Sequence, residues 1–493
     1  MELHQRLLLK AVLVLASSGV AAPAFAASPP ASPSLPALSR LASEGALVSA
    51  VVWDLQAERP VAELNSTQRL TPASLSKLVI AAAALDTWPP DKNFPTEIRS
   101  LAPPIGGTVA GDLILRGSGD ATLDETTLWA LAAQLRGNGV QRVTGGIRVE
   151  RAPFGELDCD TIDRCAGLRR SSRAYNAAPS AIGVNYGSWC IAVRAPLNAT
   201  VANVGGCATG EMPIPVAGNV TVGAIGPPLR IERTTDKGVD RIVAGGSIAP
   251  GTERQVHRAM SDPAAGAGLI LRSILRQTGV NVAGNVETTA LSVAGAGHVL
   301  ARVDGLPLQE QVGRMMRYSN NYIADVLTMG VSLETTHVAP RSLAEASKVL
   351  SDFVRKLGTP AITPADPPVM ESGSGLTTSN RLSAQDLVSV LRKQFHDSRH
   401  FPAFYGSLVV PRDASFDYLN RGNADWLDRV ALKTGSLTEP VSVNGIAGYL
   451  RTKDGGFMAF AIIVNGSQRL RQVSHERALA ASRSDVEALL ALR

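Results

Sequence analysis

The chain has 493 residues, of which 45% are apolar and 18% are charged, and its formal net charge is +5. This composition excludes global disorder, and the length predicts two or three globular domains. The net charge is small and no basic run interleaves with aromatic residues. A surface that tracks phosphates is therefore excluded, and we expect no nucleic acid among the partners.

The first 26 residues have the pattern of an export signal. Basic side chains between residues 4 and 10 precede an apolar stretch at 11–20, and Ala24-Phe25-Ala26 forms a small-residue cleavage site. The apolar stretch is shorter than the roughly 20 residues that span a bilayer. We therefore expect a signal peptide at 1–26, export to the periplasm, and no transmembrane segment after signal removal.

Two strands and a helix are predicted in the segment that follows. The stretches 46–55 and 61–65 are rich in apolar residues and are separated by a turn, which predicts a strand pair. Thr71 fits the N-cap of a helix and Pro72 fits its first position. The Ala- and Leu-rich run at 78–85 continues that helix with high propensity.

Ser74 and Lys77 are the first candidates for chemistry. We expect Ser74 in the first helical turn, where backbone N–H groups favour negative charge, and Lys77 three residues on along the same face. A serine hydroxyl needs a base, and lysine is a base only when its pKa falls below its usual value of about 10.4. The S-x-x-K pattern is weak alone, since a surface lysine near a helix start also produces it. The chain has only nine lysines, which makes an accidental match rarer.

The middle of the chain is predicted to be mainly β. From about 94 to 293, short Val, Ile and Leu runs alternate with Gly and Pro turns. Two helices are predicted within it, at 125–138 and 264–278. The stretch at about 196–250 is almost entirely strand and turn, and we predict a nested subdomain there.

Four cysteines lie within this region, and none belongs to a C-x-x-C pair. In an exported protein they favour two disulfides with three possible connectivities, and we favour Cys159–Cys165 with Cys190–Cys207. Their spacings fit a zinc site poorly, so we nominate no metal ligand.

The last third of the chain is predicted to be largely helical and to end in a hairpin and a helix. Apolar residues at 308–316 recur on one helical face, which ends near Ser319-Asn320-Asn321, and a second helix begins at Tyr322. We further predict helices at 342–357 and 383–395, a Gly-rich loop at 371–376, a strand at 429–436, a hairpin of 442–451 with 457–465, and a closing helix at 474–492.

Three motifs now stand in order: Ser74-Leu75-Ser76-Lys77, Ser319-Asn320-Asn321 and Lys433-Thr434-Gly435. Together they resemble the motifs of the active-site serine enzymes that include penicillin-binding proteins and β-lactamases. Lys77 and Ser319 are 242 positions apart, which is far more than a simple β-lactamase would place there. The set is therefore similar to that of class C low-molecular-mass penicillin-binding proteins, the D-alanyl-D-alanine carboxypeptidase/endopeptidase family. The resemblance extends to three further stretches, at 111–120, 175–181 and 372–376.

The resemblance implies an α+β fold with a β-lactamase/transpeptidase-like domain built from both chain ends and a β-rich two-part insertion. We expect the catalytic domain at 27–92 and 296–493, and the insertion at 93–295. It also implies a serine-type carboxypeptidase, with peptidoglycan stem peptides and β-lactam antibiotics as ligands and no cofactor.

The resemblance also implies roles for five catalytic residues. Ser74 would attack the carbonyl of the penultimate D-alanine, and Lys77 would be its base. Ser319 would relay a proton to the leaving amine, and Asn321 would bond the substrate backbone or Lys77. Lys433 would help to keep Lys77 neutral and to hold the terminal carboxylate. Which residue is the base at each step stays open.

Substrate binding is expected from the stretch after Lys433. Thr434 and Ser436 would offer hydroxyls to the terminal carboxylate, with Gly435 between them. Backbone N–H groups of Ser74 and Ser436 would form the oxyanion hole, in which one donor contributes about 2.7–4 kcal/mol.

Some positions depart from the family pattern. Ser372 stands where Asp is usual, Thr378 stands where Arg is usual, and arginines at 169–173 follow a cysteine-bounded loop where other members have an aromatic pocket. The preference for the diamino-acid side chain therefore stays open, as does the choice between carboxypeptidase and endopeptidase action. Two alternatives are a β-lactamase-like hydrolase and a non-catalytic wall-binding protein on the same scaffold.

Overall fold

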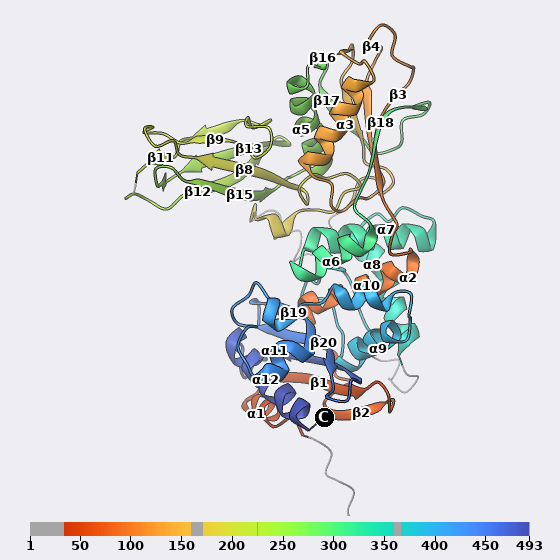
Figure 1. Cartoon of the computed structure of the whole chain (residues 1–493), viewed down its shortest axis with the longest axis vertical. Coiled ribbons are helices and arrows are strands. Elements are labelled where there is room, and N and C mark those ends of the chain that lie inside the picture. The colour runs from red at the N-terminus through yellow and green to blue at the C-terminus, as the bar shows by residue number, and fades with distance from the viewer. Residues whose placement is uncertain (1–33, 159–170, 224, 359–365, 493) are drawn as a thin grey trace, which may run out of the picture.

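Both ends of the chain build one part of the molecule, and the middle of the chain builds the rest. The computed structural model describes residues 34–158, 171–223, 225–358 and 366–492. In Figure 1 the red and blue elements of the two chain ends form the lower body, while orange-to-green elements rise above it and project to one side. Among the described residues no helix is both long and apolar enough to cross a bilayer.

An antiparallel five-stranded sheet joins the two chain ends, in the order β19-β20-β21-β1-β2. The first strand pairs with the last one in register, with Leu47 opposite Asn465. Neighbouring strands are hydrogen-bonded along their length, so this pairing holds the N-terminal and C-terminal segments together in one domain. The strands are β1 (Leu47–Asp54), β2 (Arg59–Leu64), β19 (Val430–Leu437), β20 (Val443–Arg451) and β21 (Phe457–Asn465).

Helices cover both faces of this sheet. One face packs on α1 (Pro36–Glu44), α11 (Ala424–Arg429) and α12 (His475–Ala491), and its apolar core is separate from that of the other face. The other face meets a helical layer around α2 (Ser76–Thr87), whose residues 76–85 are all buried. A helix that is apolar all round belongs in a core, which explains the Ala- and Leu-rich run. The layer also holds α6 (Leu308–Arg317), α7 (Asn321–Thr336), α8 (Leu343–Leu357), α9 (Ala384–Phe395) and α10 (Phe401–Gly406).

The predicted start of α2 is wrong in its detail. A 3-10 turn, η1 (Ala73–Leu75), precedes the α-helix, and no side chain caps either element. The Thr71 hydroxyl does not act as an N-cap, because it donates to the Thr378 carbonyl at 3.2 Å. Ala73 instead has a φ of 49°, in the left-handed region. Tertiary contacts, described below, therefore override the local capping signal.

The middle of the chain forms a second sheet with its own core. Its order is β17-β7-β5-β3-β18, and α3 (Glu125–Gly137) and α5 (Pro263–Gln277) pack on it, close to the predicted helices. The strands are β3 (Pro95–Ser100), β5 (Leu113–Gly117), β7 (Ile147–Glu150), β17 (Val286–Thr289) and β18 (His298–Asp304), beside a small sheet of β4 (Thr108–Val109), β6 (Arg142–Val143) and β16 (Asn281–Val282).

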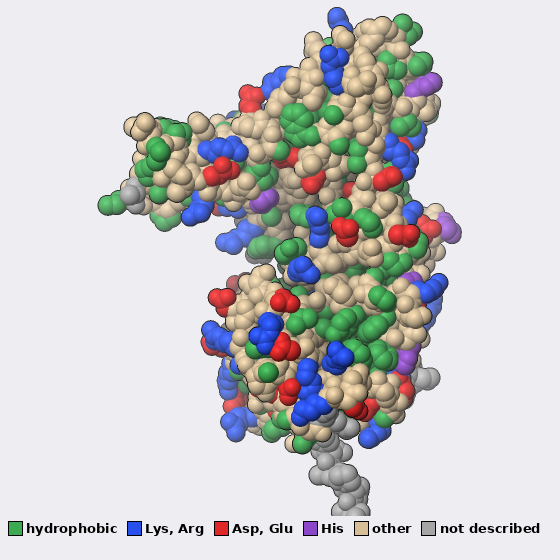
Figure 2. All heavy atoms as spheres, in the orientation of Figure 1, with side chains coloured by type: hydrophobic (Ala, Val, Ile, Leu, Met, Phe, Trp, Pro, Cys, Tyr) green, Lys and Arg blue, Asp and Glu red, His purple; other side chains and the backbone are tan. Residues whose placement is uncertain are grey.

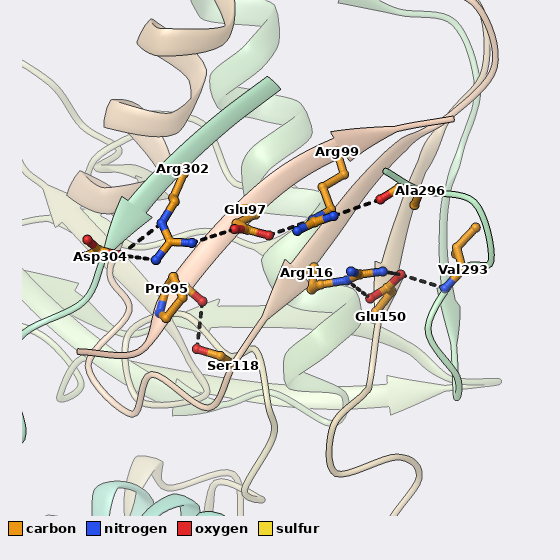
Figure 3. A network of polar contacts seen from close by, with 10 residues as sticks. All are labelled: Pro95, Glu97, Arg99, Arg116, Ser118, Glu150, Val293, Ala296, Arg302 and Asp304. Carbon is orange, nitrogen blue, oxygen red and sulfur yellow. Dashed lines mark hydrogen bonds and ion pairs between the residues drawn. The ribbon is translucent and has the colours of Figure 1, made fainter. Parts of the chain in front are cut away.

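Charged side chains of this second sheet form hydrogen bonds with the loop at residues 293–296 (Figure 3). Glu150 is completely buried and accepts from the Arg116 guanidinium at 2.9 Å and from the Val293 backbone N–H at 2.7 Å. Arg99, which contacts Glu97, donates to the Ala296 carbonyl at 3.0 Å. A buried carboxylate requires such partners, so the network fixes residues 293–296, which connect β17 to β18.

The projecting part consists of small sheets that span 188–259. The Cys190–Cys207 disulfide, which the sequence predicted, joins β8 to the residue after β9, with a sequence separation of 17 residues. The predicted Cys159–Cys165 pair lies outside the described residues. We propose that the insertion domain predicted at 93–295 also includes β18, which pairs with β3, and that this arm is its nested part. The strands are β8 (Ser188–Arg194), β9 (Asn203–Gly206), β10 (Val216–Gly218), β11 (Thr221–Val222), β12 (Arg230–Asp236), β13 (Val239–Gly245), β14 (Ser247–Ile248) and β15 (Glu253–Ala259).

Candidate active site

Ser74 lies in the 3-10 turn η1, ahead of the buried helix α2, and its side chain is half-buried. The preceding residue, Ala73, has the left-handed backbone conformation, which costs of order 1–3 kcal/mol for a residue with a Cβ. Gly375 contacts this turn so closely that a Cβ there would lie 1.9 Å from the Ala73 carbonyl oxygen. Packing of neighbouring segments therefore holds the serine in a strained turn.

Lys77 is completely buried and its ammonium nitrogen contacts three oxygens. Nζ lies 3.0 Å from Ser74 Oγ, 2.8 Å from Asn321 Oδ1 and 2.6 Å from the Ser374 carbonyl oxygen. Three acceptors match the three N–H donors of a lysine ammonium. When Lys77 loses a proton, its lone pair can face the Ser74 hydroxyl, whose proton it is placed to accept.

Ser319 and Lys433 form a second hydroxyl–amine pair. Lys433 Nζ lies 2.9 Å from Ser319 Oγ and 2.6 Å from the Thr434 carbonyl oxygen. The Lys433 side chain is only 2% exposed, and this burial lowers its pKa to about 7. Ser319 lies between α6 and α7 and has a φ of 52°, again in the left-handed region. The ammonium and neutral amine forms of Lys433 therefore coexist near neutral pH.

Asn321 connects Lys77, at the candidate site, to Tyr175, in the middle of the chain. It is the first residue of α7, and Asn320 caps that helix by accepting from the Ile323 backbone N–H. While its Oδ1 accepts from Lys77, its Nδ2 donates to the Tyr175 carbonyl at 3.1 Å. Tyr175 belongs to a 3-10 turn, η2 (Ala174–Asn176), so one amide joins both parts of the molecule at the site.

Strand β19 brings Thr434, Gly435 and Ser436 against the serine turn. A Cβ on Gly435 would lie 2.8 Å from the Pro72 carbonyl oxygen and 3.1 Å from the Ser74 nitrogen, so only glycine allows this approach. Thr434 is half-buried and bonds the Tyr418 hydroxyl, while Ser436 is exposed. The structure thus brings together the residues nominated from the three motifs.

A pocket of about 180 Å³ opens between the two hydroxyl–amine pairs. It is lined by Ser74, Ser319, Lys433, Thr434 and Ser436, together with side chains from α6 and from the segment after α10. The surface in Figure 2 is indented between the lower body and the projecting arm, on the side of the molecule where α6 and β19 lie. A larger cavity of about 550 Å³ between 211–213, α5 and 279–285 holds no paired nucleophile and base. We therefore place the candidate site at the smaller pocket.

Asp325 is a functional residue that the sequence reasoning missed. It lies on α7, one turn after Asn321, and is completely buried. Its Oδ1 accepts from the Ser374 backbone N–H at 3.0 Å and from Ser372 Oγ at 3.1 Å. Because the Ser374 carbonyl accepts from Lys77, this carboxylate positions a partner of Lys77. An aspartate inside an apolar helix, four residues after Asn321, was the available signal.

Replacing Asp325 by alanine is expected to slow acylation by benzylpenicillin about 10²-fold, since misplacement by about 1 Å has that effect. Asp325→Asn, which keeps one acceptor oxygen, should recover part of the rate. Ser332→Ala, at another buried polar position of α7, should leave the rate within about twofold. Stopped-flow acylation checks this, and the positioning role is wrong if Asp325→Ala and Ser332→Ala acylate equally fast.

One group among the described residues could hold a cation. Asp86, Asp397 and His400 present their side-chain atoms within 4.8 Å of one another. The Lys393 ammonium already lies 2.5 Å from Asp86 Oδ1, and His400 Nδ1 lies 2.9 Å from Asp397 Oδ2. Lys393 thus already supplies a positive charge to Asp86, and none of the three residues lines the candidate site.

Comparison with known proteins places the chain in a family. The fold matches that of penicillin-binding protein 4 from Haemophilus influenzae, with a TM-score of 0.74 at 21% identity over 92% of this chain and 99% of that one. This is the predicted α+β fold of the β-lactamase/transpeptidase type. The family model of the D-Ala-D-Ala carboxypeptidase 3 (S13) family matches residues 36–486. The chain therefore belongs to this family of serine-type D-Ala-D-Ala carboxypeptidases, as its motifs predicted.

Two relatives extend the match along the sequence. A D-alanyl-D-alanine carboxypeptidase of Actinomadura sp. is 27% identical over 444 residues, which cover 86% of this chain and 79% of the relative. The D-alanyl-D-alanine carboxypeptidase DacB of Haemophilus influenzae is 24% identical over 441 residues, which cover 87% of both chains. The similarity thus includes the middle of the chain as well as its two ends.

Proposed function

We propose that this enzyme cleaves D-Ala-D-Ala peptides of peptidoglycan through an acyl-serine intermediate on Ser74. The observation that carries the proposal is the 3.0 Å contact between Ser74 Oγ and the amine of the completely buried Lys77. A base at hydrogen-bond distance is what a serine hydroxyl needs to become a nucleophile. The Oγ–C bond forms, the C–N bond of the peptide breaks, and water later releases the acyl group.

The proton passes from Ser74 to Lys77 and finally to the leaving amine. Ser319 supplies the last step, because its hydroxyl lines the pocket and receives a hydrogen bond from Lys433. Asn321 holds Lys77 in place, because its Oδ1 accepts from the Lys77 ammonium at 2.8 Å. The Ser74–Lys77 contact and the Lys433–Ser319 contact are each a single hydrogen bond, which suits general acid–base catalysis.

Strand β19 supplies the binding groups. Backbone N–H groups of Ser74 and Ser436 stabilise the negative charge that develops on the carbonyl oxygen. The hydroxyls of Thr434 and Ser436, with the Lys433 ammonium, hold the terminal carboxylate. The close approach that Gly435 allows supports this role, since it brings β19 against the serine turn.

The substrates we propose are peptidoglycan stem peptides, with carboxypeptidase action on free termini and endopeptidase action on cross-links. β-Lactams would acylate the same serine. A crystal structure of the Haemophilus influenzae penicillin-binding protein 4 in complex with a β-lactam supports this, at a TM-score of 0.70 and 22% identity. The signal pattern at 1–26 supports export and action in the periplasm.

Intact-mass spectrometry of the mature protein with benzylpenicillin tests the proposal. We expect a persistent adduct of one equivalent that is absent from Ser74→Ala, because only an acylated serine retains the drug. Penicillin turnover without accumulation would instead identify a β-lactamase-like hydrolase. A protein that forms no adduct and turns over no penicillin would favour the non-catalytic wall-binding alternative.

A further inference from the structure

The site pocket has a wall that the proposed reaction does not use. Besides the catalytic groups it is lined by Arg317, from the end of α6, and by Phe416 and Tyr418, from the segment between α10 and α11. None of these three belongs to the motifs that identified the site. Their side chains are therefore available to recognise a part of the substrate beyond the scissile bond.

Arg317 is an exposed cation at this pocket. In the described part of the chain its guanidinium has no side-chain hydrogen bond and no ion pair, whereas Arg314, one turn earlier on α6, donates to the Tyr186 hydroxyl at 3.5 Å. Among the residues that the structure describes, the pocket is lined by two cationic side chains, those of Arg317 and Lys433, and by no aspartate or glutamate. An arginine fork without a protein partner suits a carboxylate, which it can bind through two parallel hydrogen bonds.

Phe416 and Tyr418 form a fixed apolar surface beside this cation. Their rings are stacked, with centroids 5.4 Å apart and planes 19° apart. The Tyr418 ring also contacts the edge of His475 at 4.5 Å, and its hydroxyl is bonded to Thr434. Phe416 nevertheless remains 39% exposed, so one of its faces is open to an apolar ligand group.

The position of Ser319 indicates which part of the substrate enters this pocket. Under the proposed function Ser319 gives a proton to the leaving amine, so that amine lies within hydrogen-bond reach of Ser319. Ser319 lines the pocket, whereas Lys77, Asn321 and Tyr175, which surround the other side of Ser74, do not. The residue that departs with the amine must therefore extend toward Arg317 and Phe416.

We infer that this pocket selects a cross-linked, acidic leaving peptide over free D-alanine. A leaving D-alanine has one carboxylate, for Lys433, and only a methyl group to place on Phe416. A diamino-acid residue within a cross-link has an alkyl chain that covers the aromatic surface, and its stem peptide has a further carboxylate that Arg317 binds. The inference rests on the proposed function and makes Arg317 a determinant of endopeptidase action.

Three synthetic substrates test this inference: a pentapeptide that ends in D-Ala-D-Ala, a cross-linked peptide dimer, and the same dimer with the acceptor carboxylates amidated. Arg317→Ala should lower kcat/KM for the acidic dimer about tenfold, the lower end of the effect of charge-assisted hydrogen bonding, because Arg317 is exposed to solvent. Its kcat/KM for the amidated dimer should change at most twofold, and Arg317→Lys should restore part of the loss. Arg341→Ala, at an exposed arginine on the approach to α8, should leave all three values unchanged.

The outcomes separate this inference from the proposed function. Equal losses for the acidic dimer, the amidated dimer and the pentapeptide would overturn the role of Arg317, even with penicillin still acylating Ser74. A selective loss for the acidic dimer supports it. If the wild-type protein forms no penicillin adduct and cleaves none of the three substrates, the proposed function itself fails, and this inference fails with it.

Discussion

Replacing Lys77 by methionine is expected to lower the rate of acylation by benzylpenicillin by about 10²–10⁴-fold, the usual contribution of a general base. The Lys77 amine lies within hydrogen-bond reach of Ser74 Oγ, at 3.0 Å. Methionine has a similar length and no charge, so it suits the completely buried position and should preserve the fold. Stopped-flow acylation at several pH values gives the measurement.

A second lysine provides the control for this change. Lys348, on α8, is exposed, and Lys348→Met should acylate at the wild-type rate. Thermal unfolding should show that Lys77→Met retains a cooperative transition. If the variant acylates within tenfold of the wild type, Lys77 is not the base, and Lys433, whose pKa burial lowers to about 7, becomes the candidate.

Local sequence patterns were sufficient for most of the helices and strands. The hairpin of β20 and β21 follows from two apolar runs around Asp454-Gly455-Gly456, where Gly455 has a φ of 90°. The helix α5 follows from its apolar face and from Asp262, which accepts from two backbone N–H groups at its start. Such signals lie within a few residues of one another, and a single sequence displays them directly.

Features that depend on contacts between distant segments were not accessible in this way. The turn at Ala73 and Ser74 contradicts the predicted cap because Gly375 and Gly435, which follow it by more than 300 residues, pack against it. Asp325 acquires its role only when the loop with Ser372 and Ser374 packs on α7. The residues of the three motifs could nevertheless be nominated as site residues from the sequence. The resemblance to a known family indicated that these distant motifs belong to one site, whereas hydrophobic periodicity gives no such information.

The aromatic wall of the pocket escaped prediction for another reason. Phe416 and Tyr418 lie in a segment without regular structure, between α10 and α11, where no apolar period marks one face. Their proximity to Ser74 results from the position of that segment beside β19, since Thr434 bonds Tyr418. A lone aromatic pair in a loop is a weak signal until the fold places it at a site.

The pH dependence of substrate binding is expected to follow Lys433. Burial lowers the pKa of this amine to about 7, so it loses its charge as the pH rises through that value. A terminal carboxylate then loses a cationic partner, and its binding weakens. The ratio of kcat/KM for a D-Ala-D-Ala peptide to kcat/KM for its C-terminal amide should therefore fall above pH 7. Taking the ratio removes the effect of Lys77, which both peptides share.

Lys433→Met should abolish this change in the ratio and raise KM for the acid peptide by about 10–100-fold, the contribution of a charge-assisted hydrogen bond.

The same substitution should weaken substrate binding but raise the free energy of unfolding. The unfolded chain binds the Lys433 proton more tightly than the folded one, so the wild type gains stability as the pH rises from about 7 toward the normal lysine pKa of 10.5. The methionine variant lacks this gain and should be more stable than the wild type at pH 7. If the variant binds more weakly and also unfolds more easily at pH 7, Lys433 is a structural cation whose hydrogen bonds to Ser319 and Thr434 outweigh its burial, and the proposed pH dependence is wrong.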